Sequence, residues 1–257
     1  MRRSLLLAFT GLYLLLLSGC HGGLVAPQSP RTLRVLTYNI HHGEGTDEVF
    51  DYERQASLIN RLSPDLVALQ EVDRGTGRAG GVDQAAVLAR LCDMHHAFGQ
   101  AMPYDGGQYG EAVLSRFPIE RTVVHPLPHQ ADQEPRAALD VHVRPEGIRP
   151  LRFVGTHLCH QSGETRLQQV LRLRRLFHAE EGPPVILAGD LNARPGSEPM
   201  RTLLASGWRD VVAPRSVIDY VLVREADSWR ICEVRIPDEP VASDHDPVLV
   251  VLEWMAE

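Results

Sequence analysis

Short apolar runs of strand length alternate with segments of helical spacing along most of the chain. Residues 33–39 alternate like a strand, and the segment ends on Asn39. Residues 52–62 instead repeat apolar side chains with the period of a helix, and Pro64 follows directly. The same criteria predict further strands at residues 65–71, 111–115, 137–143, 151–156, 184–188, 218–223, 229–235 and 247–252, and helices at 83–91, 164–179 and 199–205.

These predicted strands and helices are interleaved, and no linker divides them. The chain of 257 residues is 44% hydrophobic and 23% charged, which is ordinary for a globular protein. We therefore predict one α/β domain that covers residues 32–257.

Polar side chains stand at the ends of several predicted strands. Asn39 and Glu71 each close an apolar run, and Asp190 and Asn192 follow the run at 184–188. Strand periodicity places Asp190 and Asn192 on the same side of the chain. Strand ends are where α/β folds build their sites, so these groups are candidates for chemistry.

The residue types at these strand ends suit the hydrolysis of a phosphate ester. Carboxylates such as Glu71 and Asp244 are ligands that Mg²⁺ or Mn²⁺ prefers, and Asp190 can activate or orient a water. His245 follows Asp244 directly, and Asp219 could orient its imidazole. Taken singly, each residue also has a plain structural explanation, such as a turn cap or a solvent-facing strand position.

Six short motifs in order resemble the endonuclease/exonuclease/phosphatase superfamily, which includes DNase I-like nucleases, inositol polyphosphate phosphatases and bacterial sphingomyelinases. The resemblance covers residues 33–252 and implies a four-layer α/β sandwich, with two mixed β-sheets packed face to face and flanked by helices. The motifs are Thr37-Tyr38-Asn39, Leu69-Gln70-Glu71, Thr156-His157, Gly189-Asp190-Leu191-Asn192, Ile218-Asp219-Tyr220 and Ser243-Asp244-His245.

The resemblance also implies a role for each matching residue. Glu71 corresponds to the main metal carboxylate, with Asn39 and Asp244 close to the Mg²⁺ or Mn²⁺ ion. Arg136, in the segment Glu134-Pro135-Arg136, is expected near the substrate. The catalytic residues that the resemblance implies are Asp190 for the attacking water, Asn192 beside it, His157 and His245 on either side of the phosphate, and Asp219 as the partner of His245.

Two features depart from this pattern or compete with it. Glu111 stands where such relatives usually carry Asn, and near a cleft its carboxylate would repel a phosphate or recruit another cation. The adjacent pairs His41-His42 and His95-His96 lack a Cys or acidic partner at ligand spacing, so we expect structural histidines, with His42 as a rim residue.

The N-terminus predicts export. Arg2 and Arg3 precede an apolar stretch at residues 5–17, and Leu17-Ser18-Gly19-Cys20 resembles a bacterial lipobox. We expect a signal peptide at residues 1–19, a lipid on Cys20, a tether at 20–31 and a location in the bacterial cell envelope, on its periplasmic or outer face. An ordinary signal peptide and an uncleaved anchor helix are the alternatives.

We therefore expect a monomeric, lipid-anchored, metal-dependent phosphoesterase that attacks phosphorus directly with water. The substrate is open between a nucleic acid, a phospholipid head group and a small phosphorylated metabolite. The net charge of −7 disfavours a dedicated nucleic-acid binder. Aromatic residues make up only 6% of the chain, so a sphingomyelinase-like enzyme lacks an obvious aromatic hairpin for membrane insertion. The alternative from another class is a non-catalytic surface binding module that retains the fold.

Overall fold

A computed structural model describes residues 31–177 and 182–255 of the chain. The predicted signal peptide, the predicted lipidation site Cys20 and nearly all of the predicted tether lie outside the described residues, so they stay predictions. None of the helices within the described ranges is long and apolar enough to cross a membrane.

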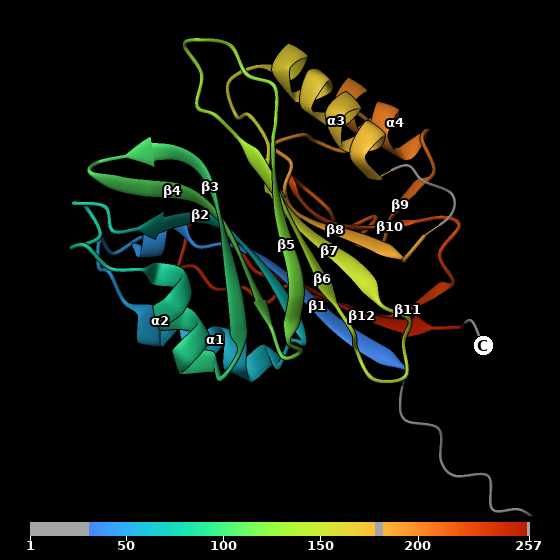
Figure 1. The fold of residues 1–257 in the computed structure, drawn as a ribbon, viewed down its shortest axis with the longest axis horizontal. Helices are drawn as coiled ribbons and strands as arrows, with labels where there is room; N and C mark the ends of the chain where they lie inside the picture. The colour runs from blue at the N-terminus through green and yellow to red at the C-terminus, as the bar shows by residue number, and fades with distance from the viewer. Residues whose placement is uncertain (1–30, 178–181, 256–257) are drawn as a thin grey trace, which may run out of the picture.

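Two six-stranded mixed sheets form the centre of the molecule (Figure 1). Among the strand pairs of the described residues, only β1–β2 and β7–β8 are parallel. The first sheet has the order β11 (Trp229–Arg235), β12 (Val248–Trp254), β1 (Thr32–Asn39), β2 (Leu66–Arg74), β4 (Gly107–Ser115) and β3 (His95–Tyr104). The second has the order β5 (Ile119–Pro126), β6 (Ala137–Val143), β7 (Leu151–His157), β8 (Val185–Asp190), β10 (Asp219–Arg224) and β9 (Trp208–Asp210).

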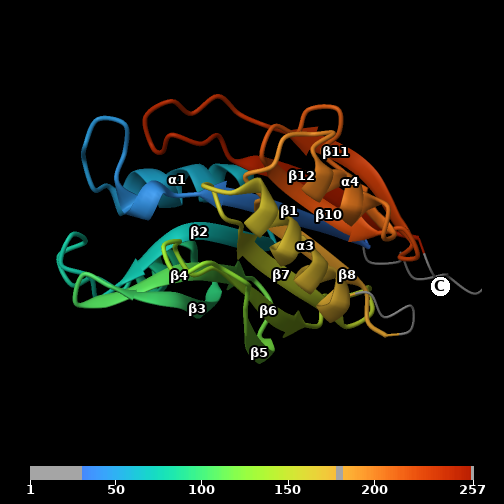
Figure 2. The ribbon, with the colours of Figure 1, turned by 90° about the horizontal axis from the view of Figure 1, so that it is seen from above.

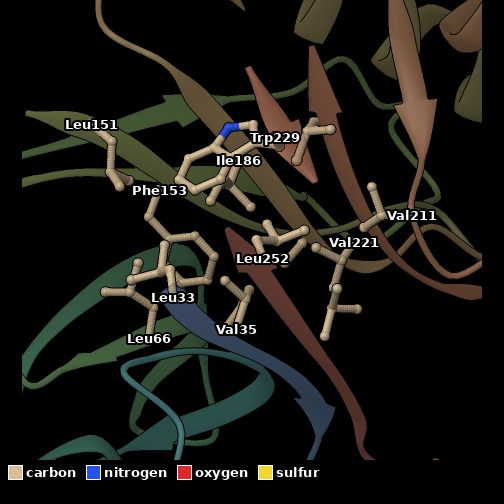
Figure 3. Close-up of a cluster of buried hydrophobic side chains, with 14 of the residues drawn as sticks. Leu33, Val35, Leu66, Leu151, Phe153, Ile186, Val211, Val221, Trp229 and Leu252 are labelled. Carbon is tan, nitrogen blue, oxygen red and sulfur yellow. The ribbon is translucent and has the colours of Figure 1, made fainter. Parts of the chain in front are cut away.

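Strand alternation explains why the sheets pack face to face. Leu33 and Val35 point into a core shared by both sheets, which includes Phe153 and Ile186 of the second sheet (Figure 3). Leu36, on the same strand, points the other way, toward the helices. A strand that is buried on both faces needs apolar residues on both, which is what the continuous apolar runs supply.

The helices cover the two outer faces of this sandwich. Helices α1 (Tyr52–Leu62) and α2 (Gln84–Cys92) pack on the first sheet, and α3 (Gly163–Phe177) and α4 (Glu198–Leu204) on the second. The two helix pairs lie on opposite sides of the molecule (Figure 1). The predicted four-layer α/β sandwich is confirmed.

Three edge strands, β3, β5 and the three-residue β9, have no counterpart in the sequence prediction. They lie at the outer edges of the two sheets, where most of their side chains are exposed or half-buried. An edge strand with exposed side chains does not need an apolar alternation, so its sequence carries little strand signal. The turn between β3 and β4 is Asp105-Gly106, with φ of 43° and 79°, which is the backbone of a type I′ hairpin.

Candidate active site

Strand ends from both sheets meet at one edge of the sandwich. In the second sheet Asp190, at the end of β8, pairs with His157 on one side and with Asp219 on the other. The sheet register itself therefore places these three side chains together. Asn39, at the end of β1 in the first sheet, reaches across the sandwich, with its Nδ2 3.4 Å from Asp190 Oδ2.

A cavity of about 340 Å³ opens over these strand ends. Asn39 lies beneath it, buried at 1% exposure. Among the residues expected to form a site, those that line the cavity are Glu71, Arg136, His157, Asp190, Asn192, Asp244 and His245.

Glu71 occupies a strained position at a β-bulge of β2. Its φ is 60°, in the left-handed region, and the register of β2 against β4 shifts between Leu69 and Val72. Asn39 Nδ2 donates a hydrogen bond of 3.0 Å to Glu71 Oε1. Burial would raise the pKa of Glu71, but the neighbouring His42, His157, Asn39 and Arg136 lower it well below its ordinary value. Glu71 is therefore an ionised carboxylate at the floor of the cavity.

Asp190 and Asn192 form a tight local unit after β8. The Asn192 backbone N–H donates to Asp190 Oδ1 at 2.8 Å, and Asn192 has a left-handed φ of 47°. The Asn192 side chain donates from Nδ2 to the Leu158 carbonyl at 3.1 Å. Burial, followed by the charge of Asp219, raises the pKa of Asp190. A carboxylate with a raised pKa accepts a proton more readily than an exposed one.

His157 is a fully buried imidazole with a polar side chain next to each ring nitrogen. Arg136 Nη1 lies 3.1 Å from its Nδ1, and Asn192 Nδ2 lies 2.9 Å from its Nε2. Burial and the charge of Arg136 lower the pKa of His157 well below its ordinary value. The ring is therefore neutral, in contrast to the second histidine of the site.

His245 is held in the opposite state by Asp219. Its Nδ1 lies 2.9 Å from Asp219 Oδ2, and its Nε2 lies 3.8 Å from Asp190 Oδ2. Burial alone would lower the pKa of His245, but the hydrogen bond and the charge of Asp219, together with Asp190 and Asp244, raise it to about 9. At neutral pH His245 therefore carries a proton on Nε2, the nitrogen that faces the cavity side of Asp190.

Two sets of side chains could hold a cation. Ligand atoms of Asp190, Asp219 and His245 lie within 4.8 Å of one another. In that set, however, Asp219 and His245 already share a hydrogen bond through their nearest atoms. Glu71 is ionised, and the exposed Asp244 lines the same cavity, so the oxygen donors expected from the sequence fit Mg²⁺ or Mn²⁺ better.

Asn39 is placed mainly to orient other groups. Its Oδ1 accepts the His41 backbone N–H at 3.0 Å, while its Nδ2 faces Glu71 and Asp190. One lone pair of Oδ1 remains for a cation. The hydrogen bond from Asn39 Nδ2 therefore orients the carboxylate of Glu71.

Several residues of the site were not predicted from the sequence. Tyr109 and Arg78 line the cavity, and Glu134 pairs with Arg136 at 2.7 Å. His42, expected at the rim, does line the cavity and lies 3.9 Å from Glu71 Oε2. In the sequence, Arg78 lies in a Gly- and Arg-rich loop at residues 73–82. Such a composition does not distinguish a functional site from an ordinary turn.

Glu111 lies beneath the site and does not line the cavity. It is fully buried, and both carboxyl oxygens lack a hydrogen-bond partner among the described residues. Burial raises its pKa well above the ordinary value; Arg136 opposes this shift, and Glu71 and Asp190 add to it. The carboxyl group is therefore protonated and neutral, so it does not repel a phosphate as its sequence position suggested.

We expect Glu111→Gln to stabilise the protein increasingly as pH rises. Below a pH of about 4.3, Glu111 is protonated in both the folded and the unfolded chain, so the substitution changes little. Above it, the unfolded chain loses a proton that the folded chain keeps, which lowers wild-type stability as pH rises. Urea unfolding at pH 8 should show a gain of at least about 1 kcal/mol, larger than the gain at pH 5. The exposed Glu225→Gln is the control, and a gain independent of pH would contradict a buried neutral carboxyl.

The comparisons with known proteins agree with this geometry. The sequence profile of the Endonuclease/Exonuclease/phosphatase family matches residues 36–245. The structure of an endonuclease/exonuclease/phosphatase from Beutenbergia cavernae is 28% identical, with a TM-score of 0.74 over 87% of this chain and 72% of that one. The uncharacterised protein YbhP of Escherichia coli is 25% identical over 63% of this chain and 67% of its own length.

A more distant similarity concerns a yeast enzyme. The inositol phosphosphingolipids phospholipase C of Saccharomyces cerevisiae is 28% identical over 57% of this chain, a match that spans 34% of the yeast protein. Members of the matched family are hydrolases of phosphate esters and generally depend on a divalent metal. With a match over most of its length, and with the strand-end residues gathered in one cavity, this chain belongs to the endonuclease/exonuclease/phosphatase family.

Proposed function

We propose that the protein hydrolyses a phosphate ester by direct attack of water on phosphorus, with a divalent cation bound. The observation that carries the proposal is the junction at Asp190. Its Oδ2 lies 3.4 Å from both Asn39 Nδ2 and His157 Nε2, and 3.8 Å from His245 Nε2. One buried carboxylate therefore lies close to polar groups from both sheets, and these groups could bind a phosphate.

Each side chain then has a distinct task. Asp190, with its raised pKa, takes the proton of the attacking water. Asn192 is fixed by its own hydrogen bonds and positions that water. His245 donates its Nε2 proton toward a phosphoryl or leaving-group oxygen, because Asp219 keeps it protonated. Opposite protonation states of His157 and His245 follow from their different surroundings.

Glu71, Asp244 and the remaining lone pair of Asn39 would hold the Mg²⁺ or Mn²⁺ ion. When bound, the ion supplies positive charge that offsets the negative charge on the phosphoryl oxygens. Arg136 adds a fixed positive charge beside His157, since its side chain is 2% exposed and hydrogen-bonded to Glu134 and Tyr109.

The substrate class is favoured by charge and by one similarity. The net charge of −7 disfavours a nucleic acid, which needs a basic surface for binding. The similarity to the yeast phospholipase C supports a small phosphorylated molecule or a phosphorylated head group instead.

Removal of divalent cations is expected to lower turnover at least about a hundredfold, because the positive charge of the ion, which offsets the charge on the phosphoryl oxygens, is then lost. Phosphate ester hydrolysis by the purified protein would be measured on p-nitrophenyl phosphate and bis-p-nitrophenyl phosphate, before and after treatment with EDTA. Addition of Mg²⁺ or Mn²⁺ should restore the hydrolysis rate of the wild type. The rate of Glu71→Ala should rise only weakly, because this variant lacks a proposed ligand of the ion.

A protein that stays fully active in EDTA would contradict the metal dependence. A wild type that binds Mn²⁺ in calorimetry but turns over none of the esters would instead favour a binding module. These two outcomes separate the choice of cofactor from the question of catalysis.

A further inference from the structure

The cavity has a second wall that the proposed hydrolysis does not use. It is made of Arg78, from the loop after β2, with Met102, Tyr104 and Tyr109 from the β3–β4 hairpin. We call this set the tyrosine wall. The loop and the hairpin tip lie at the same end of the molecule in both views (Figures 1 and 2). The rigidity and the charge of the tyrosine wall indicate which kind of group it can bind.

Arg78 is held in one place by a buried carboxylate. Its Nε donates to Asp73 Oδ2 at 2.6 Å and its Nη2 to Asp73 Oδ1 at 3.0 Å. Asp73 is fully buried and also accepts from the Thr76 hydroxyl at 2.8 Å. The Arg78 backbone N–H donates to Asp105 Oδ2, at the hairpin turn, so the loop is fastened to the hairpin. A bidentate pair of this kind fixes the orientation of a guanidinium.

The two tyrosine rings are stacked against arginines. The guanidinium carbon of Arg78 lies 4.5 Å from the Tyr104 ring centre and 5.6 Å from that of Tyr109. Tyr109 also meets Arg136, whose guanidinium carbon lies 6.0 Å from the ring centre and whose Nη1 donates to the phenol oxygen at 3.3 Å. The tyrosine wall is therefore continuous with the Arg136–His157 side of the cavity, where the phosphate would bind.

The charges of the cavity argue against a second anionic group at this wall. Asp73 compensates the charge of Arg78, whereas Glu71, Asp190 and Asp244 add negative charge to the same cavity. Arg78 Nη1 nevertheless has no hydrogen-bond partner within residues 31–177 and 182–255, so its N–H groups can serve a ligand. A neutral group that accepts hydrogen bonds suits this environment better than a phosphate.

We propose that the tyrosine wall binds the hydroxyl-bearing ring of a phosphorylated sugar or cyclitol, and so selects that ring as the alcohol part of the ester. Flat aromatic faces pack against the C–H face of such a ring, and a fixed guanidinium donates to its hydroxyl oxygens. The inference rests on the proposed function for the position of the phosphate. It assigns specificity to Tyr104 and Arg78, which take no part in the attack on phosphorus.

Tyr104→Ala tests this assignment, because Tyr104 is 39% exposed and its loss should not unfold the protein. Phosphate release would be measured from glucose 6-phosphate, myo-inositol 1-phosphate and ethyl phosphate, which has neither ring nor free hydroxyl. We expect kcat/KM for the two ring substrates to fall about tenfold, and that for ethyl phosphate to change less than about twofold. Tyr104→Phe keeps the ring and should keep the selectivity. Ile231→Ala, with the same exposure on β11, is the control away from the cavity.

Binding gives a second measurement that does not depend on turnover. Calorimetry with glucose 6-phosphate and Mn²⁺ would compare Asp190→Asn with Asp190→Asn/Tyr104→Ala, and we expect about tenfold weaker binding to the second.

Equal losses for ring and non-ring esters, or no loss in either measurement, would overturn the proposal. The proposal would also be overturned if fructose 1,6-bisphosphate bound more tightly than glucose 6-phosphate and Arg78→Ala abolished this preference. Arg78 would then bind a second phosphate group and not ring hydroxyls. A wild type that binds the ring phosphate through Tyr104 but hydrolyses no ester would refute the proposed function and leave the ring site standing.

Discussion

Asp190→Asn is expected to lower the kcat of ester hydrolysis about a thousandfold, with little change in the fold. The amide has the shape of the carboxylate, and its oxygen can still accept the Asn192 backbone N–H that now bonds Asp190 at 2.8 Å. It cannot take a proton from water, and general base catalysis contributes about two to four orders of magnitude in rate. The loss should appear in kcat, because Asp190 acts on the water rather than on the bound ester.

The control for this experiment is a second buried aspartate of the same sheet. Asp140 on β6 is 1% exposed and bonds Arg152 at 2.6 Å, but it does not line the cavity. Asp140→Asn should lower stability and leave kcat within about twofold. Circular dichroism and the denaturant midpoint would show that Asp190→Asn is folded. If folded Asp190→Asn kept more than a tenth of wild-type kcat, Asp190 could not be the proton acceptor.

The strand-end residues were predictable from the sequence because the topology forces them together. Parallel strands β7 and β8 place their carboxyl ends side by side, so His157 and Asp190 are neighbours once these two strands pair. Asp219 begins β10, which runs antiparallel to β8, and therefore reaches the same edge. The apolar runs that predicted these strands are long because each strand is buried on both faces.

The parts that could not be predicted depend on contacts remote in sequence or on local backbone shape. The left-handed φ of Glu71 comes from a bulge in β2 opposite β4, and no residue type in this segment predicts that bulge. The tyrosine wall needs β3, an edge strand whose exposed side chains gave no alternation to detect. The burial of Glu111 could not be predicted for a related reason, since burial rather than sequence position decides whether a carboxyl group is charged.

Gly189→Ala is expected to destabilise the protein by at least about 3 kcal/mol, because a methyl group cannot fit at this position. Gly189 has a φ of 155° and pairs with Thr156 of β7, and a Cβ there would lie 1.8 Å from the Thr156 carbonyl oxygen. The clashing atom belongs to the backbone of a central strand, so it cannot move aside as a flexible side chain would. Relief would require β7 and β8 to separate just before His157 and Asp190, so residual activity should fall together with stability.

The denaturant midpoint of Gly189→Ala, followed by intrinsic tryptophan fluorescence, checks this expectation against a matched glycine. At Gly163, the first residue of α3, the atom nearest to an added methyl group would be Arg166 Nη2 at 3.7 Å, an ordinary contact. Gly163→Ala should therefore be neutral or stabilise slightly, by up to about 1 kcal/mol, since alanine restricts the unfolded chain. Should Gly189→Ala unfold at the wild-type midpoint, the close approach of β7 and β8 would be wrong. The placement of Asp190 against His157 rests on that same backbone contact and would be wrong with it.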